Sequence, residues 1–166
     1  MDTEIKEQIT PQIELVPYNF DNHLELLTNW LQNKDLMHGW GMNTFENSEE
    51  VNKWASGSTR AVLMVNDINS NEIVGMVNFY DWDKEKHVAS RGTLIDPKFQ
   101  NRGYGKASIL LSNNYAFDEM KLTRIELYVE GYNEVSRHIT EKLGYKFDRY
   151  NSKKDRYYYF MDNPNQ

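Results

Sequence analysis

The run from Leu94 to Ala107 contains residue types that could bind a phosphorylated ligand. Pro97 ends a β-rich stretch, two glycines follow in a basic turn, and an apolar helix is expected to begin directly after them. Glycine lets the backbone come close to a ligand, and the free N–H groups of a helix's first turn attract anions. The glycines and the flanking cations are Gly103, Gly105, Arg102 and Lys106. We expect a diphosphate site here; the alternative is an ordinary strand–turn–helix connection with solvated basic residues.

Two common phosphate-binding motifs do not fit this run. A P-loop requires Ser or Thr after its Gly-Lys pair, and Gly105-Lys106 is followed by Ala107. A dinucleotide-binding fingerprint requires a third glycine where Ser108 stands. The phosphorylated ligand is therefore expected to belong to another class.

Two motifs together resemble the GNAT family of N-acetyltransferases. The spacing Gln100-x-x-Gly103-x-Gly105 matches the family signature Q/R-x-x-G-x-G/A. The block Asn133–Tyr145 is similar to the family's Asn-x-x-Ser/Ala…Glu-Lys-Leu-Gly-Phe/Tyr segment. The resemblance extends from about residue 72 to 148, and Asn133-x-x-Ser136 is closest in pattern to the branch that includes ribosomal-protein N-acetyltransferases.

This resemblance implies an acyltransferase that uses acetyl-CoA as its co-substrate. In the family the fourth and fifth strands splay apart, which here would open a gap between Thr93–Ile95 and Leu127–Val129. Pantetheine would lie in that gap, backbone amides of the basic turn would hold the pyrophosphate, and the side chain of Asn133 would bind the pantetheine arm. The implied CoA-binding residues are Leu94, Ile95, Gln100, Asn101, Arg102, Gly103, Tyr104, Gly105, Lys106, Asn133 and Ser136.

The resemblance also implies direct transfer of the acetyl group from the thioester to an amine. The backbone N–H near Ile95 would polarise the thioester carbonyl. Many members protonate the leaving thiolate with a Tyr seven residues after the Asn, but that position is Thr140 here. Ser136 lies one helical turn after Asn133 and could act as the general acid, or it could only bind CoA or backbone.

No general base is assigned. The stretch Ala89–Gly92, where many family members place a Glu, has no carboxylate. A water chain is one possibility, and the candidates by region are Glu126, Asp81, Asp83 and His87. We interpret His138 as a surface residue and favour a packing role for His38.

The charge distribution bears on the amine acceptor. Residues 1–90 hold 6 Lys/Arg and 15 Asp/Glu, a balance of −9, whereas residues 91–166 hold 13 and 10, a balance of +3. The second half is expected to bind anionic CoA, and the first half favours a cationic amine by steering. A protein α-amine, an amino sugar and a polyamine all remain open, and Trp30, Trp40 and Trp54 could line an aromatic wall.

The elements that must position these residues follow from hydrophobic patterning and turn signals. We predict an α/β or α+β fold around one sheet, and the resemblance implies about six or seven mostly antiparallel strands with about four helices. Strands are expected at 13–17, 61–65, 73–80, 87–96, 124–130, 145–147 and 156–161. Helices are expected from Asp21, from Asn47, from Gly103 to about Met120, and from Asn133 to Leu143, with a loop at Met37–Met42.

The composition of the chain argues against several other classes of protein. The chain has 166 residues, 39% of them apolar, which suits a single domain spanning 1–166. It has no cysteine and a net charge of −6, which exclude thiolate sites and argue against nucleic-acid binding. No apolar run is long enough for a membrane span, and Met1–Glu7 lacks the pattern of a secretory signal, so a cytoplasmic protein is expected. We expect no metal, and a monomer or homodimer; the alternative function is a non-catalytic CoA-binding or sensing module.

Overall fold

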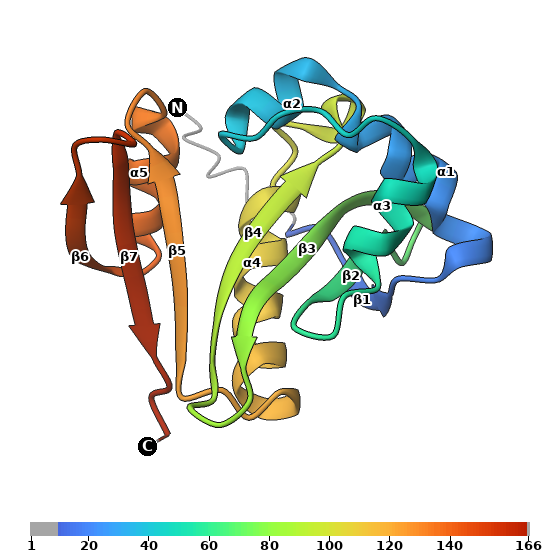
Figure 1. The fold of residues 1–166 in the computed structure, drawn as a ribbon. Coiled ribbons are helices and arrows are strands. Elements are labelled where there is room, and N and C mark those ends of the chain that lie inside the picture. The colour runs from blue at the N-terminus through green and yellow to red at the C-terminus, as the bar shows by residue number, and fades with distance from the viewer. Residues whose placement is uncertain (1–9, 166) are drawn as a thin grey trace, which may run out of the picture.

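One seven-stranded sheet forms the centre of the computed structural model, which describes residues 10–165 (Figure 1). The spatial order of the strands is β1-β2-β3-β4-β5-β7-β6. In chain order the strands are β1 (Ile13–Pro17), β2 (Ala61–Asp67), β3 (Glu72–Asp83), β4 (Val88–Ile95), β5 (Arg124–Glu130), β6 (Lys146–Asn151) and β7 (Arg156–Asp162). The N-terminal segment Met1–Glu7, used above to argue against a secretory signal, lies outside the described residues.

The sheet is antiparallel except between β4 and β5. These two strands are parallel and pair only over Val88–Ser90 and Arg124–Glu126. Beyond Ser90 and Glu126 they diverge, and Figure 1 shows the gap widening toward their carboxyl ends. The predicted mixed, mostly antiparallel sheet with splayed fourth and fifth strands is therefore confirmed.

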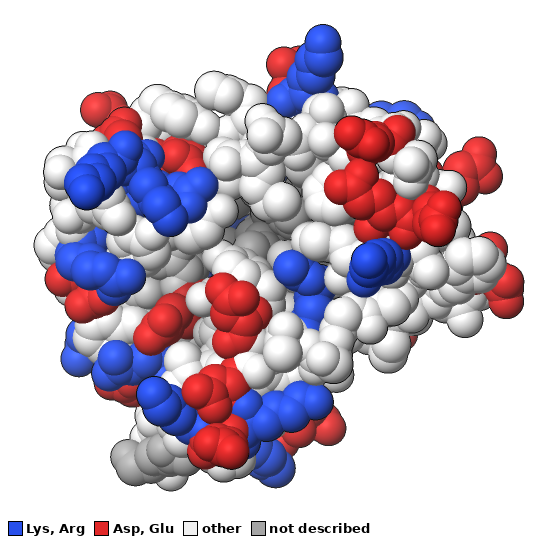
Figure 2. Space-filling model, viewed as in Figure 1, with Lys and Arg blue, Asp and Glu red and all other residues white. Residues whose placement is uncertain are grey.

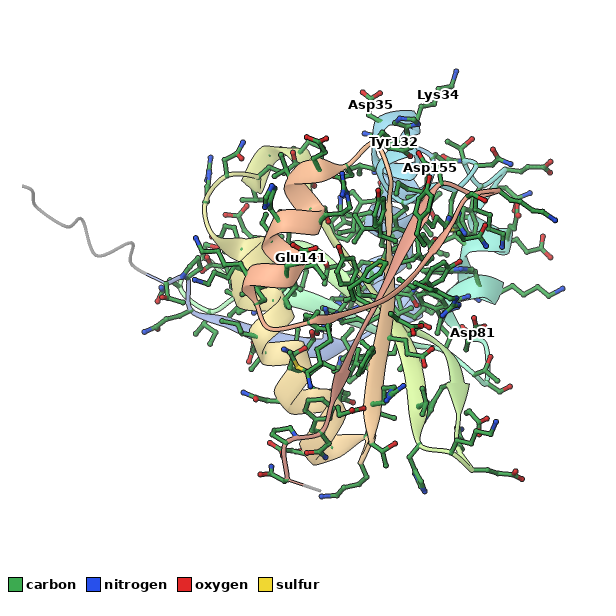
Figure 3. The ribbon with its side chains drawn as sticks, turned by 90° about the vertical axis from the view of Figure 1, so that its left-hand side faces the viewer. Lys34, Asp35, Asp81, Tyr132, Glu141 and Asp155 are labelled. Carbon is green, nitrogen blue, oxygen red and sulfur yellow. The ribbon has the colours of Figure 1, made fainter. Side chains whose placement is uncertain are left out.

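Helices cover both faces of the sheet. On one face lie α1 (Phe20–Leu31), α2 (Lys34–Gly39) and α3 (Ser48–Ala55), and on the other α4 (Tyr104–Asn114) and α5 (Glu134–Lys142). In the view of Figure 3, Glu141 of α5 and Asp81 of β3 lie on opposite sides of the sheet. None of the helices within residues 10–165 is long and apolar enough to cross a membrane.

Each face has its own hydrophobic core, because alternate residues of a strand point to opposite faces. Leu27, Trp30 and Val51 pack with Met64 and Leu94 on the side of α1–α3; the core on the side of α4 includes Leu63, Val65, Val77, Phe79, Phe117 and Tyr159. The alternation of Met76, Val77, Asn78, Phe79 and Tyr80 along β3 consequently places Asn78 and Tyr80 on the α1–α3 side.

Two predictions for the first half of the chain were wrong. The loop expected at Met37–Met42 begins within α2, because Asn33 Oδ1 accepts hydrogen bonds from the backbone N–H groups of Asp35 and Leu36 at 3.0 and 3.1 Å. The N-cap of α1 is Asn19 rather than Asp21, since its side chain accepts from Asn22 N at 3.1 Å. Residues 10–165 therefore form five α-helices, one more than the approximate number expected.

The helix predicted from Gly103 to Met120 is divided. α4 ends at Asn114 and continues as a wider π-type turn over Tyr115–Glu119. Leu110 is 43% exposed, while Ser108, Ser112 and Asn113 are buried. The buried side of α4 is partly polar because it faces the buried Arg91, whose Nη1 donates to Asn113 Oδ1 at 2.5 Å.

The first residue of α4 is attached to β2. Tyr104 donates its hydroxyl hydrogen bond to Asp67, which also accepts from the backbone N–H groups of Asn69 and Ser70 at 2.9 and 3.0 Å. The bond from Tyr104, with help from these N–H groups, holds the pKa of the Asp67 carboxyl below its usual range. This contact ties the start of α4 to the sheet.

A group whose pKa is lowered by folding stabilises the fold above its unfolded pKa of about 3.9, and this contribution is lost as pH falls toward the folded value. We therefore expect Asp67→Asn to lower Tm at pH 7 and to flatten the fall of Tm as pH drops from 5 to 3. Thermal unfolding across this range measures both effects. Glu25→Gln, an exposed change in α1, is the matched control, and equal flattening in the two variants would contradict the assignment.

Candidate functional site

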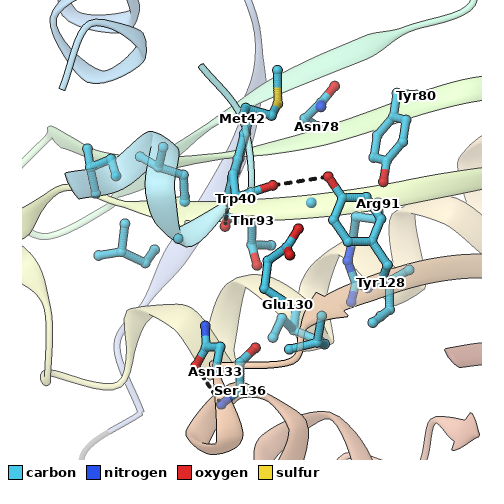
Figure 4. A pocket seen from close by; sticks show the side chains of 18 of the residues that line it. Trp40, Met42, Asn78, Tyr80, Arg91, Thr93, Tyr128, Glu130, Asn133 and Ser136 are labelled. Carbon is cyan, nitrogen blue, oxygen red and sulfur yellow. Dashed lines mark hydrogen bonds between the residues drawn. The ribbon is translucent and has the colours of Figure 1, made fainter. Parts of the chain in front are cut away.

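A cleft of about 520 Å³ opens where β4 and β5 diverge. Figure 2 shows the hollow in the centre of this face, and Figure 4 shows its lining. Five residues of the sequence-derived site line the cleft: Leu94, Ile95, Gln100, Asn133 and Ser136. These five belong to the second half of the chain, and Trp40, Trp54 and Tyr80 of the first half line the same cavity.

The two strand edges that border the cleft present backbone groups to it. Asp96 N donates to Val74 O at 2.8 Å, so the backbone groups of Asp96 face β3. Successive residues of a strand direct their backbone groups to opposite edges, so those of Thr93 and Ile95 face the gap. Gly131 N donates to Asp155 O at 2.7 Å, so the backbone of Tyr128 faces the gap from β5 by the same alternation. An extended ligand with amide groups could pair with both edges.

The predicted diphosphate turn lies at one end of this gap. Gly103 has φ +86° and is the N-cap residue of α4, with no side-chain cap. The first N–H of α4 bonded within the helix is that of Ala107, to Gly103 O at 3.1 Å, which leaves the amides of Tyr104, Gly105 and Lys106 without helical partners. Gln100 connects turn and cleft, because its Nε2 donates to Ile95 O at 3.1 Å.

The residues of the glycine turn differ in how their side chains and backbone groups lie relative to the cleft. Asn101, Arg102 and Lys106 are exposed beside the cleft rather than in its lining. The Tyr104 side chain is turned away to Asp67, so that only its backbone N–H is available to a ligand. Buried Asp96 fixes the strand end before the turn, accepting from Trp30 Nε1 and from Lys98 N, both at 2.9 Å.

Asn133 and Ser136, both predicted from the sequence, lie together in the cleft lining at the start of α5. Asn133 caps the helix, its Oδ1 accepting from Ser136 N at 3.1 Å, and Figure 4 shows its amide nitrogen directed toward the cavity. Thr140 Oγ1 donates to Ser136 O at 2.7 Å. The hydroxyl at the position of the family's usual Tyr is thus used within the helix.

A segment that sequence reasoning treated only as a loop crosses the cleft. We call residues 38–42 the bridging loop. Trp40 Nε1 donates to Thr93 O on β4 at 2.9 Å, and Tyr128 of β5 donates from its hydroxyl to Trp40 O at 3.1 Å (Figure 4). Both diverging strands are therefore attached to Trp40.

The bridging loop has two further attachments at the end of β5. Arg156 Nη2 donates to Gly41 O at 3.3 Å while its Nε is ion-paired with Glu130 Oε1 at 2.7 Å. Gly41 has φ +67°, and a Cβ at this position would collide with Glu130 Oε1. The His38 ring stacks on Tyr132 with centroids 4.6 Å apart, which agrees with the packing role expected for it.

The opposite end of the cleft, on the α1–α3 side, is aromatic and hydrogen-bonding. Trp40 and Trp54 line it, whereas Trp30 is in the core bonded to Asp96. Burial raises the pKa of both Tyr80 and Tyr128, so these phenols stay protonated and can only donate or accept hydrogen bonds at neutral pH. Tyr128 belongs to the strand edge expected to border the gap, whereas sequence reasoning missed several other lining residues, among them Arg60, Asn78, Tyr80, Arg91 and Glu130.

The regional candidates for the general base are not among the residues that line the cleft. Glu126 and His87 are exposed, Asp83 caps a turn by accepting from Glu85 N and Lys86 N, and Asp81 lies in the bulge after Tyr80. The carboxylates in the described lining belong to Asp35, which is exposed (Figure 3), and to the ion-paired Glu130. Within residues 10–165 no group of three or more His, Asp or Glu side chains could hold a metal ion.

A sheet opened at one parallel pair, with a glycine turn and a free helix start at one end, defines a protein that binds a long phosphorylated co-substrate. The family model for the acetyltransferase (GNAT) domain matches residues 12–146. The chain therefore belongs to the GNAT acetyltransferase family.

Relatives and solved structures agree with this assignment. The chain is 24% identical over 126 residues to a spermidine N(1)-acetyltransferase of Vibrio cholerae, covering 74% of this chain and 72% of that protein. It is 29% identical over 73 residues to the putative ribosomal N-acetyltransferase YdaF of Bacillus subtilis, covering 44% and 40%. The structure of the V. cholerae enzyme with CoA and spermine superposes with a TM-score of 0.83 at 19% identity over 91% of this chain and 95% of that one. A GNAT acetyltransferase of Bacillus anthracis gives 0.75 at 22% identity over 92% and 96%.

The two glycines of the turn are predicted to have different roles. A Cβ at Gly103 would lie 3.3 Å from Pro11 Cδ, and φ +86° is unfavourable for any other residue, so Gly103→Ala should cost about 1–2 kcal/mol of unfolding free energy. A Cβ at Gly105 would lie 3.9 Å from Ile95 Cγ1, an ordinary contact, so Gly105→Ala should leave stability nearly unchanged. Denaturant unfolding of the two variants measures the difference, and equal losses would contradict it.

Proposed function

We propose that this protein transfers the acetyl group of acetyl-CoA directly to an amine that enters from the α1–α3 side of the sheet. The observation that carries the proposal is the gap between β4 and β5, whose inward-facing backbone groups lead from the free amides of α4 to the aromatic end of the cleft. A single cavity thus connects a site for a diphosphate with a site for an acceptor.

The chain's own groups fit acetyl-CoA along this path. The amides of Tyr104, Gly105 and Lys106 would bind the pyrophosphate, with Arg102 and Lys106 side chains adding charge-assisted contacts. Pantetheine amides would pair with the exposed backbone of Thr93, Ile95 and Tyr128, and the Asn133 amide nitrogen would bind the same arm. The V. cholerae spermidine acetyltransferase with a closely similar fold binds CoA, which supports this placement.

The reaction needs one bond made and one broken. The neutral amine nitrogen attacks the thioester carbonyl carbon, and the tetrahedral intermediate collapses with cleavage of the C–S bond. The proton that the nitrogen loses on becoming an amide is taken up by the departing sulfur, so that CoA leaves as the thiol. An inward-facing N–H of Thr93 or Ile95 would stabilise the oxyanion, and the Ser136 hydroxyl would donate to the departing sulfur. Glu130 is ion-paired with Arg156, so we infer that the ammonium proton leaves to solvent in the open cleft.

One relative is named for spermidine and another as a putative ribosomal N-acetyltransferase, and we retain a primary amine as the acceptor group. The V. cholerae enzyme has been solved as a dodecamer; for this chain a monomer or homodimer remains our prediction. The competing function is a CoA-binding or sensing module without turnover. It is favoured by Thr140 and by the absence of a carboxylate in Ala89–Gly92.

The function is tested by release of free thiol from acetyl-CoA in the presence of a panel of amines. Thiol release above the rate without amine, together with an acetylated amine identified by mass, supports transfer. Micromolar acetyl-CoA binding with no thiol release across the panel would support the sensing module instead. Absence of acetyl-CoA binding would overturn both functions.

The role of Ser136 is tested separately. If its hydroxyl donates to the leaving sulfur, Ser136→Ala should lower kcat about tenfold and leave the Kd for CoA within about twofold, because the group acts on the transition state. Thr140→Val is the matched control, since that hydroxyl is bonded to Ser136 O, and should change kcat little. A raised Kd with unchanged kcat would assign Ser136 to CoA binding alone.

A further inference from the structure

Arg60 places a cation at the acceptor end of the cleft. Its guanidinium lies 4.2 Å from the centroid of the Trp54 ring and 5.8 Å from that of Tyr80. Burial lowers its pKa and nearby Asp81 partly offsets this effect, but an arginine remains protonated at neutral pH. No ion pair joins Arg60 to a carboxylate among residues 10–165. The charge of Arg60 is therefore available to a ligand.

Asn78 adds a second donor beside this cation. Its Oδ1 accepts a hydrogen bond from Arg60 Nη1 at 2.9 Å, which fixes the orientation of the amide. Its Nδ2 can then only donate, and the residue lines the cleft although it is 4% exposed overall. Arg60 and Asn78 together form a pair of donors that requires an oxygen acceptor.

The other charges of the cleft do not form a site for a polycation. Glu130 is neutralised by Arg156, and Asp35 is exposed at the rim. Arg91 is a second cation in the lining, and its partners Ser112, Asn113 and Tyr145 are uncharged. Figure 2 shows Lys or Arg side chains as well as Asp or Glu around the hollow. The Arg91 side chain points to α4 on the other face of the sheet, so a polyamine entering on the α1–α3 side would meet the charge of Arg60, which no carboxylate of residues 10–165 ion-pairs. This charge opposes the binding of a polycation.

We propose that the acceptor is an amine that carries a carboxylate or carbonyl oxygen near its nitrogen, and that Arg60 and Asn78 bind this oxygen group. The inference rests on the proposed function and specifies its acceptor. Arg60 would supply the positive charge that attracts the oxygen group, and Asn78 Nδ2 would donate a directional hydrogen bond to it. The ring faces of Trp54 and Tyr80 hold the guanidinium in place. Free amino acids and peptide N-termini share this chemistry, and the test separates them.

The experiment compares acceptors of matched size on the full chain with saturating acetyl-CoA. The arms are free α-amino acids, the same residues as amides and short peptides, alkylamines without an oxygen group, and spermidine. We expect kcat/KM for the oxygen-bearing arms to exceed that for alkylamines and spermidine at least about tenfold, because only these acceptors offer an oxygen to the Arg60 guanidinium and the Asn78 amide, and a cation without such an oxygen is repelled by Arg60. Activity restricted to free acids identifies a carboxylate ligand, and activity with peptides identifies a carbonyl ligand.

Two variants test the residues themselves. Arg60→Met keeps a long side chain against Trp54 without the charge, and Asn78→Asp keeps the shape while giving Arg60 a carboxylate partner. Each should lower kcat/KM for oxygen-bearing amines about tenfold or more and leave the Kd for acetyl-CoA within about twofold. Lys84→Met, which removes an exposed cation 4.7 Å from the centroid of the Trp82 ring, is the matched control and should change neither.

The outcomes distinguish this inference from the proposed function. Alkylamines or spermidine used as well as the oxygen-bearing amines would overturn the inference while acetyl transfer stands. The inference is also overturned if Arg60→Met and Asn78→Asp both fold and both keep the wild-type preference for oxygen-bearing amines. Absence of thiol release with every amine would overturn the proposed function and, with it, the acceptor assignment.

Discussion

The structure depends on the unpaired backbone edges that β4 and β5 expose after they separate. Each buried N–H and C=O group without a partner costs free energy, so a sheet cannot open within its interior unless other groups compensate. The protein compensates part of the edge itself, because Trp40 binds Thr93 O and Gln100 binds Ile95 O. The amides that remain are the ones a co-substrate with its own amide groups can satisfy.

The bridging loop explains how the opened sheet keeps its geometry. It is bonded to β4 through Trp40, to β5 through Tyr128 and to β7 through Arg156. These contacts span the two halves of the chain, so the separation of the strands is held by side chains on the α1–α3 side rather than by strand pairing. Gly41 allows this arrangement because a side chain there would displace Glu130 from Arg156.

Much of the fold, and five residues that line the cleft, could be predicted from the sequence because the signals were local. Alternating apolar residues marked the strands, and the glycine turn with Asn133 and Ser136 marked a known family. The sequence could not show why residue 103 must be glycine, because its positive φ and its closeness to Pro11 arise only when the chain is folded. The polar buried side of α4 could not be predicted either, because Arg91, which it faces, lies in another element.

The acceptor end was the least predictable part, since Arg60, Asn78 and Tyr80 come from separate points of the β2–β3 region and only the sheet brings them together. The net charge of residues 1–90 suggested a cationic partner, but most of those carboxylates lie outside the cleft lining. Local placement of a few charges, rather than their sum over half a chain, governs the environment of a ligand.

The placement of α4 and α5 on one face and of Trp54, Asn78 and Tyr80 toward the other has a geometric consequence. In the reaction proposed above, the two reactants approach from opposite sides of the sheet and meet within its plane. A single molecule that imitates both of them at once must pass through the opening between the strands, so its connecting portion can be no thicker than an extended chain.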